Sequence, residues 1–534
     1  MMNSSPGKPR ARLSCFQCRR SKRRCDRVLP FCDLCIRNGI ECSYPTRRGE
    51  KSSNDPEGRT AAATGLAAID PATGSYYLPH NLIPVTESSG AAAAVSFIAP
   101  HVFQLAQLAM PRHNPLIPME VAAHIGDTPS TRSMATVFFK TIHIWMPIIS
   151  KKRFFIRILN PLSQRGPECS LLILCMKLCC TPPSSDSGDG RSPIYSAAKR
   201  FHFEVEAAGV LSVHVLQATV LIAIYEMGQA IYPAAFLTVG ACARYGMALG
   251  IHELGQDVTG GAERQCSWLE TEELRRAWWA VLVLDRLLNI TNPVKRLSTD
   301  DPTFDSYLPV DDKAWDQGTT SPGDAVRLSA GFHLRMGLFA RVAQATYLVS
   351  QALNASSTPL SGVGRSLATS DDTAQLRRTI FALVKTADTE AIVRQLEFCP
   401  QSSICYSAIL LLQTHNTQGQ ARSFNNRTDE SAAELFFETE SALEDLSRMA
   451  RELCAKWKDE SCIADCTSLF LIQVVYQAAS TLTRLGEGTP DVTAQERIED
   501  LKELLRRLTP RWRVAGVYLS ILASEEAIAA MAAI

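Results

Sequence analysis

Apolar residues recur with helical spacing from about residue 131 to residue 534, and segments with strict two-residue alternation are scarce. Clusters of proline, serine, asparagine and glycine interrupt this pattern at 182–186, 292–293, 356–370 and 417–431. The pattern therefore predicts a mainly α protein with a large all-helical body over residues 131–534.

The clearest helix is predicted over residues 267–289. Ser267 and Glu270 have the spacing of a capping box, and Glu272 and Arg276 have the spacing of an ion pair across one turn. The apolar positions that follow recur on one predicted buried face: Leu274, Trp278, Val281, Leu284 and Leu288. Because Trp279 adjoins Trp278, we expect both flanks of this helix to be covered, as in a central core helix.

Two longer apolar stretches, 207–225 and 227–243, are long enough to raise the question of a membrane. Only Glu226 separates them, whereas a hairpin of two membrane spans needs a polar turn. We therefore expect two buried helices of a large core and no membrane partner.

Residues 51–130 differ in composition, because alanine, glycine, serine and threonine dominate and no apolar heptad is sustained over 50–100. This composition predicts a flexible linker with one short helix near Phe103–Met110. Residues 1–50, 51–130 and 131–534 are thus expected to be a head, a linker and a body.

Charge separates the head from the rest of the chain. The whole chain has a net charge of +1, but residues 1–50 hold 12 Lys and Arg against 4 Asp and Glu, a net of +8. The other 484 residues therefore carry −7. A compact basic head on a mildly acidic body predicts a module that binds a polyanion.

Cysteine usage excludes a disulfide framework. The chain has 17 cysteines, an odd number, and eleven of them lie outside the head in largely apolar surroundings. The first residues are polar and basic, without the apolar segment of a secretory signal. We therefore expect buried free thiols in a reducing compartment.

The six head cysteines form an internal repeat with an offset of 17 residues, C-x2-C-x6-C in each half. Each half offers three thiolates, whereas a closed tetrahedral zinc site takes four ligands. Six cysteines satisfy two zinc ions if two of the sulfurs bridge both metals, and no histidine precedes His80. The predicted metal ligands are Cys15, Cys18, Cys25, Cys32, Cys35 and Cys42.

Basic residues occupy only the first half of the repeat. We expect a helix after Cys18 that carries Arg19, Lys22 and Arg23 on one face and enters the major groove of double-stranded DNA. The predicted DNA contacts are Arg19, Arg20, Lys22, Arg23 and Arg24. Two alternatives are weaker: a zinc cluster for protein contacts with a basic import signal, and RNA, for which the head lacks stacking aromatics.

The stretch CFQCRRSKRRCDRVLPFCDLCIRNGIEC resembles the DNA-binding domain of fungal zinc binuclear cluster transcription factors. The resemblance implies two zinc ions per chain, with Cys15 and Cys32 as the bridging thiolates. It also implies a nuclear protein in which Lys22 reads a CGG triplet. Pro30 corresponds to the family's loop proline, which is often cis.

Parts of the body resemble the fungal-specific transcription factor domain, an all-helical regulatory domain. The resemblance rests on FFKTIHIWMPIISKKRFF, ARYGMALGIHEL, ETEELRRAWWAVLVLDRLLN and YLPVDD, although ITNPVKRLSTDD replaces the usual turn. It assigns no effector site, and we expect Arg275 and Asp285 to be structural residues.

We expect no enzymatic activity, because H-E-x-x-H, G-x-S-x-G, phosphate-loop and dinucleotide-binding motifs are absent from the sequence. The resemblance instead implies a regulator of RNA polymerase II genes, more often an activator, in a metabolic or secondary-metabolite pathway. Two acidic–apolar stretches could recruit coactivators: 300–316, expected to be a surface loop, and 429–446, expected to be an amphipathic helix. Because no heptad follows the cluster, the protein either forms a homodimer through its helical body or binds one half-site as a monomer.

Overall fold

The structure is a computed structural model of the whole chain. It describes the following residues: 11–21, 23–37, 42–45, 68–69, 76–77, 89–106, 108, 110, 114–160, 165–183, 189–254, 267–290, 296–332, 336–356, 370–394, 400–420, 429–457, 463–485 and 492–532. The chain forms two compact units, Met1–Pro111 and Arg112–Ile534.

The first unit contains few regular elements. Helices α1 (Phe16–Arg20) and α2 (Asp33–Arg37) belong to the cysteine-rich head. The strands β1 (Ala68–Ile69) and β2 (Tyr76–Tyr77) pair antiparallel, with Ala68 opposite Tyr77.

Two further helices, α3 (Ser89–Ile98) and α4 (Pro100–Leu105), end the described part of the first unit. The short helix predicted at Phe103–Met110 is therefore misplaced, since helix begins earlier and ends at Leu105. The run of four alanines in α3 explains the error. Its composition is typical of a linker, yet alanine has the highest helix propensity of all residues.

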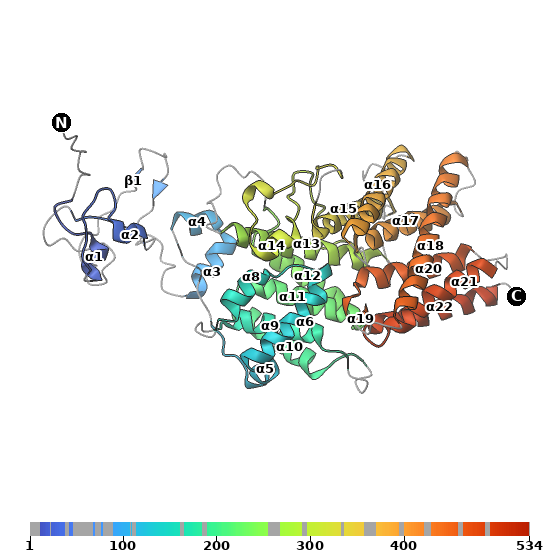
Figure 1. Cartoon of the computed structure of the whole chain (residues 1–534), viewed down its shortest axis with the longest axis horizontal. Coiled ribbons are helices and arrows are strands. Elements are labelled where there is room, and N and C mark those ends of the chain that lie inside the picture. The colour runs from blue at the N-terminus through green and yellow to red at the C-terminus, as the bar shows by residue number, and fades with distance from the viewer. Residues whose placement is uncertain are drawn as a thin grey trace. The chain divides into compact units, whose positions relative to one another are not determined.

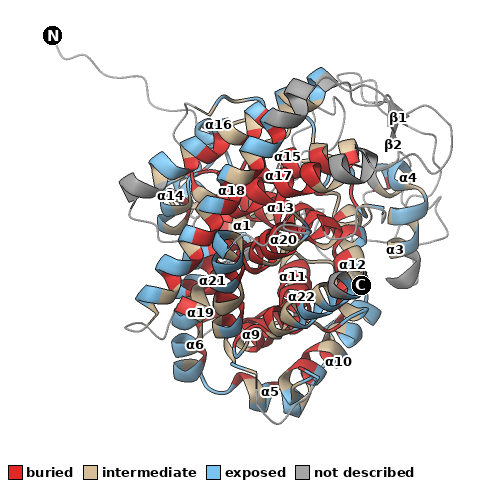
Figure 2. Ribbon diagram, turned by 90° about the vertical axis from the view of Figure 1, so that its right-hand side faces the viewer, coloured by how far each residue is buried: buried red, intermediate tan, exposed pale blue. Residues whose placement is uncertain are grey.

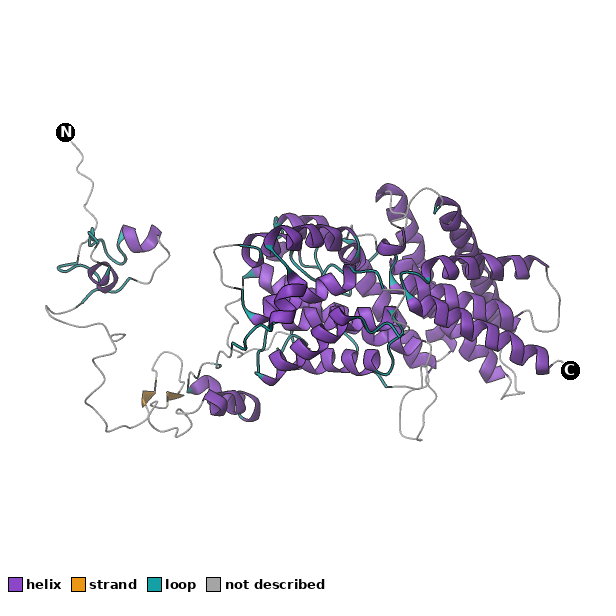
Figure 3. Ribbon diagram, turned by 90° about the horizontal axis from the view of Figure 1, so that it is seen from below, coloured by secondary structure: helices purple, strands orange, loops and turns teal. Residues whose placement is uncertain are grey.

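The second unit is built from helices (Figures 1 and 3). Its first part contains α5 (Met119–Ile125), α6 (Thr128–Lys140), α7 (Ile142–Trp145), α8 (Lys151–Arg153), the π-helical turn η2 (Phe154–Ile158), α9 (Pro167–Cys180), α10 (Pro193–Ala207), α11 (Val213–Gly228), α12 (Ala234–Ala248) and α13 (Trp268–Ile290). Its second part contains α14 (Asp312–Gln317), the 3-10 turn η3 (Pro322–Asp324), α15 (Leu338–Ser356), α16 (Ser370–Arg394), α17 (Pro400–Gln420), α18 (Asp429–Lys456), α19 (Ile463–Cys466), α20 (Leu469–Leu485), α21 (Val492–Leu508) and α22 (Arg513–Ala532). The predicted mainly α fold is confirmed.

A continuous apolar core runs through the second unit, with α11, α13, α15, α17 and α20 inside it (Figure 2). Helix α11 packs against α9, α12 and α13, while α17 packs against α15 and α20. Every residue of α11 from Val215 to Gly228 is buried. The apolar stretches at 207–225 and 227–243 thus contribute to core helices, although α11 runs past Glu226 and α12 is buried on one face only. Within the described residues, no helix combines the length and apolar character that crossing a bilayer requires.

Helix α13 begins as the sequence predicts. The Ser267 backbone N–H donates to the Glu270 carboxylate (3.0 Å), and the Glu270 N–H donates back to the Ser267 hydroxyl (3.4 Å). The predicted single buried face is too narrow, however. Leu274, Trp278 and Leu288 are only half-buried, because charged side chains of the same helix take fully buried positions instead.

The predicted pair Glu272–Arg276 lies in the core, with both side chains completely buried. Arg276 Nε donates to Glu272 (2.9 Å), and its guanidinium also reaches Asp312 (2.7 Å) and the Val310 carbonyl (2.6 Å). It lies 4.0 Å from the centroid of the Trp315 ring. One arginine therefore ties α13 to a segment about 35 residues further along the chain.

Asp285 also connects α13 to a segment further along the chain. Its carboxylate accepts from the backbone N–H groups of Ser298 and Thr299, each at 2.9 Å. Arg286 beside it donates to Ser350 (2.8 Å) and to Asp301 (2.9 Å). The polar residues of α13 are thus structural, as expected for Arg275 and Asp285.

These contacts show that the expectation of a surface loop at residues 300–316 is wrong. Leu308, Val310 and Trp315 of that segment are buried against the core. The other acidic stretch, 429–446, lies in α18 with Leu435, Leu443 and Leu446 buried, so the predicted amphipathic helix is confirmed.

No disulfide joins the described cysteines, and several of those in the body are buried. In the body, burial raises the pKa of Cys169 and of Cys180 to about 12. Such thiols stay protonated at neutral pH and react slowly.

Candidate zinc cluster and DNA-binding surface

The two head helices reproduce the 17-residue offset of the cysteine repeat, since α1 begins at Phe16 and α2 at Asp33. Cys15 and Cys32 directly precede the two helices. The Cys18 N–H donates to the Cys15 sulfur (3.4 Å), so a thiol takes the place that serine or aspartate usually fills at a helix start. The two halves of the cysteine repeat thus resemble each other in structure as well as in sequence.

The cysteine sulfurs gather at the spacing of a shared metal site. Cys15 Sγ lies 3.8 Å from Cys32 Sγ, 3.8 Å from Cys35 Sγ and 3.9 Å from Cys25 Sγ. Cys32 Sγ lies 3.7 Å from Cys18 Sγ. Tetrahedral zinc with Zn–S bonds of about 2.3 Å places its sulfurs about 3.8 Å apart. A disulfide would need about 2.05 Å.

Cys15 and Cys32 occupy the centre of this group. Cys15 contacts one sulfur from its own half, Cys25, and one from the other half, Cys35. Cys32 contacts Cys18 of the first half, and its backbone N–H donates to Cys42 Sγ (3.3 Å). Each of the two central cysteines therefore reaches ligands of both halves.

Burial of these thiols favours their protonated forms unless a cation is bound. Burial raises the pKa of Cys35 to about 12 and also raises those of Cys15 and Cys18. Burial acts on Cys32 in the same direction, but hydrogen bonds from Cys35, Cys18 and Cys42 lower its pKa to about 6. A zinc ion ionises coordinating thiols outright, so the donor set fits zinc.

Polar contacts outside the sulfur group hold the two halves together. Asp26, directly after Cys25, accepts the backbone N–H of Asp33 (3.2 Å) at the start of α2. The Tyr44 hydroxyl donates to the Val28 carbonyl (2.8 Å), and the Leu29–Pro30 peptide bond is cis. Sequence reasoning missed Asp26 and Tyr44, since neither belongs to the repeat.

The basic residues of the first half surround the end of α1. Arg19 in α1 and Arg23 and Arg24 beyond it are exposed. The side chain of Arg20, and Lys22 as a whole, lie outside the described residues. Helix α1 ends at Arg20. Beyond this end, the Arg23 N–H donates to the Cys18 carbonyl (2.9 Å). Arg19 and Arg23 thus do not share a helix, contrary to the helix expected after Cys18.

Comparison with known proteins extends this picture to the body. Residues 13–51 match the family model of the Fungal Zn(2)-Cys(6) binuclear cluster domain, and residues 135–384 match the Fungal specific transcription factor domain. Transcription factor BOA15 of Botryotinia fuckeliana is 39% identical over 163 residues, which cover 30% of this chain and 87% of that protein. The chain belongs to the fungal zinc binuclear cluster transcription factors.

Two further relatives of this transcription factor match over longer stretches at lower identity. The citrinin biosynthesis transcriptional activator mrl3 of Monascus ruber is 22% identical over 56% of this chain and 65% of that protein. The azaphilone cluster-specific transcription factor azaR of Aspergillus niger is 23% identical over 52% of this chain and 57% of that protein. These two matches span less than two thirds of each relative's length.

Membership settles the broad function. The chain is a zinc-binding, DNA-binding transcription factor and not an enzyme, because both domains and the named relatives are regulators. Factors of this family are in general nuclear. The sequence-based recognition of the family is confirmed.

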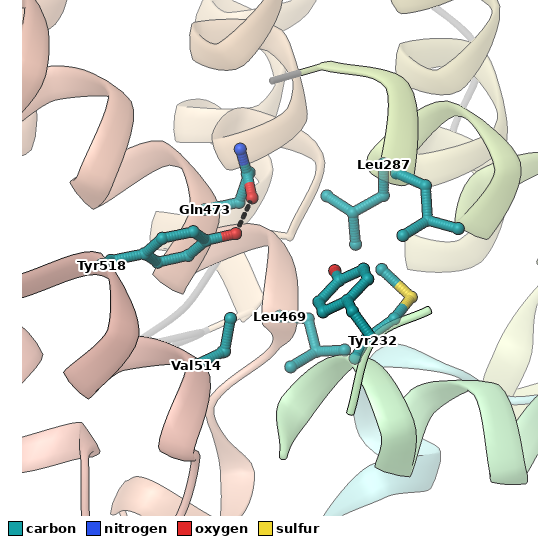
Figure 4. Close-up of a pocket in the computed structure, with 8 residues that line it drawn as sticks. Tyr232, Leu287, Leu469, Gln473, Val514 and Tyr518 are labelled. Atoms are coloured by element: carbon teal, nitrogen blue, oxygen red, sulfur yellow. Dashed lines mark hydrogen bonds between the residues drawn. The ribbon is translucent and has the colours of Figure 1, made fainter. Parts of the chain in front are cut away.

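The regulatory domain contains a small cavity where α11, α13, α20 and α22 meet (Figure 4). Leu287, Leu469 and Val514 line it, and the Tyr518 hydroxyl donates to the Gln473 side-chain oxygen at one end. Its volume of about 30 Å³ holds roughly two water molecules, whereas small-molecule sites measure several hundred Å³. The cavity therefore gives no support for an effector site.

Proposed function

We propose that this transcription factor binds two zinc ions through six cysteines and uses the first half of the cluster to read CGG-type half-sites. The ligands are Cys15, Cys18, Cys25, Cys32, Cys35 and Cys42, of which Cys15 and Cys32 bridge the metals. The observation that carries this proposal is the central position of Cys15 and Cys32. Cys15 Sγ lies within 4 Å of sulfurs from both halves, and Cys32 lies beside the Cys18 sulfur while its own N–H donates to the Cys42 sulfur.

The charge asymmetry supports the assignment of the DNA-facing side. Arg19, Arg23 and Arg24 are exposed on the first half, and Arg20 and Lys22 belong to the same run. Lys22 is assigned to base edges in the major groove, and the arginines to phosphates and neighbouring base edges. Contact with phosphates makes the affinity depend on salt.

The proposed organisation follows the composition of the chain. We assign residues 1–50 to the DNA-binding domain, 51–130 to a linker and 131–534 to the regulatory domain. The last part of the linker includes α5, which already packs against α9 of the regulatory domain. Relatives named for citrinin and azaphilone gene clusters support a nuclear activator of a secondary-metabolite pathway.

A surface on α18 supports contact with coactivators. Residues 429–446 contain seven acidic and no basic residues. The amphipathic pattern explains the buried leucines, but it leaves Phe436 and Phe437 51% and 76% exposed. Replacing both with alanine should lower reporter transcription while DNA affinity stays unchanged. Unchanged transcription would remove this surface from the proposal.

Site selection with the full-length protein and a random duplex pool tests the proposed function. We expect enrichment of CGG-containing sites and two zinc ions per chain by elemental analysis. One zinc per chain, or binding without sequence preference, would overturn the proposal.

A further inference from the structure

The outer face of the last helix, α22, carries no charge. Four of its large apolar side chains are exposed to solvent: Val517 by 41%, Ile521 by 37%, Ile528 by 67% and Met531 by 76%. The exposed positions between them hold only small residues, Ser520, Ala523, Ser524 and Ala527. An exposed helix face normally carries charged residues.

The acidic residues of α22 lie on its other side. Glu525 accepts the Ser480 hydroxyl of α20 (2.9 Å), and Glu526 pairs with Lys502 of α21 (2.5 Å). The neighbouring helix α21 has the ordinary arrangement, with Glu499 and Arg506 exposed and leucines buried. Helix α22 also packs Val514, Ala515 and Leu522 into the core, so it is apolar on its inner face as well as on its exposed face.

The exposed residues follow a heptad. Val517, Ile521, Ser524, Ile528 and Met531 are separated by four, three, four and three residues. This places both isoleucines at equivalent positions of the heptad, the a positions, where β-branched residues favour two-stranded pairing. The spacing is that of a seam between two helices.

We propose that this seam, Val517–Met531, is the surface on which α22 of a second copy of the chain docks. An uncharged heptad face is complementary to itself, as a two-fold symmetric interface requires. The 484 residues outside the head carry −7, so two copies can approach most closely through a face without charge. The inference rests on the proposed function only for its consequence on DNA, where a dimer would bind two half-sites.

The size of the seam sets the strength of the dimer. Fifteen residues of helix span about 21 Å, and pairing two such faces buries roughly 1,000 Å² in total. That area is at the lower limit of specific interfaces, so the dimer should form in the micromolar range and depend on concentration. DNA with two half-sites would strengthen it by raising the effective concentration.

Analytical ultracentrifugation of the zinc-loaded full-length protein across a concentration series tests the seam. The test variant is Ile528→Glu/Met531→Glu, whose residues are the most exposed of the four. The matched control is Phe203→Glu/Leu237→Glu, which places two charges on residues of α10 and α12 that are 69% and 65% exposed. Circular dichroism and thermal melting establish that each variant is folded.

We expect the wild type and the control to dimerise and the test variant to dimerise at least about 30-fold more weakly. All three proteins should bind a duplex with one half-site equally, and only the test variant should lose cooperative binding to two. A monomeric wild type, or equal dimerisation of a folded test variant, would overturn the seam. If the wild type does not bind the duplex with one half-site, the result would instead count against the proposed recognition of DNA.

Discussion

The head and the body of this transcription factor are held together by different means. Among the described residues of the head, the buried core consists of five cysteines, with Cys25, Leu34 and Tyr44 packed against them. The body has a continuous core that extends from Val121 to Leu522. The comparison teaches that the DNA-reading unit depends on metal, whereas the regulatory unit depends on packing and on buried ion pairs. Each should therefore fail under different changes.

Removing one bridging cysteine should have the largest effect. Cys32→Ser takes a ligand from both proposed metal sites, and structural zinc supplies about 10–16 kcal/mol of folding free energy in small domains. We expect loss of both zinc ions and of specific DNA binding, with no change in the melting of the body. Zinc analysis, DNA titration and calorimetry measure the three quantities.

Cys42→Ser is the matched control for the bridging assignment, because Cys42 lies at the edge of the sulfur group. It should retain more zinc than Cys32→Ser. Equal loss from the two variants would contradict the assignment of Cys32 as a bridge.

Breaking a buried pair should destabilise only the body. Arg276→Met leaves the Glu272 carboxylate buried without this partner, which costs about 3–5 kcal/mol. Urea denaturation should show this loss, while zinc content stays at the wild-type value. Arg506→Met removes an exposed pair with Glu499 and should change stability by about 1 kcal/mol or less. Similar losses from both variants would contradict the importance of burial.

Within the head, the two halves should differ in their effect on DNA. Lys22→Ala should weaken binding to the cognate site by about 1–3 kcal/mol and relax the preference at that position. Arg37→Ala alters an exposed arginine of the second half and should have little effect. Titration of cognate and mutated duplexes distinguishes the two variants. Equal weakening of binding to all duplexes would make Lys22 a phosphate contact.

The smallest expected effect concerns the start of α13. Ser267→Ala removes the hydroxyl of the capping box and should destabilise the body by about 1 kcal/mol, measured by urea denaturation. The backbone N–H of Ser267 also lowers the pKa of Glu270 below its ordinary value of 4.5. The stabilisation from ionised Glu270 is thus complete above pH 4.5 and is lost as the pH falls through the lowered value. Unchanged stability in Ser267→Ala would show that the cap is dispensable.

The sequence predicted those features that depend on local spacing. Cysteine spacing identified the cluster, and the relation of Ser267 to Glu270 located the start of α13. Arg276 shows the limit of such reasoning. Its pairing with Glu272 was predictable at four residues, but its contacts with Asp312 and Val310 depend on the tertiary fold. Periodicity therefore selected the half-buried Leu274 and Trp278 and missed the buried charges.

The error in the head has a different cause. Helix α1 begins at Phe16, because the Cys15 sulfur accepts the N–H that a serine or aspartate would accept elsewhere. A cysteine is not an ordinary helix-start signal, so the sequence predicts a helix that carries Arg19 and Arg23 together, whereas α1 ends at Arg20, within the basic run. A metal ligand can thus also determine where secondary structure begins.

The spacing of the cysteine sulfurs has a consequence for the newly synthesised chain. The body has an extended apolar core of its own, which can form as its helices are made. Among the described residues of the head, the buried core consists of cysteines, whose sulfurs lie 3.7–3.8 Å apart with no disulfide between them. If the head takes up two zinc ions as proposed, metal supply becomes a checkpoint between translation and transcription.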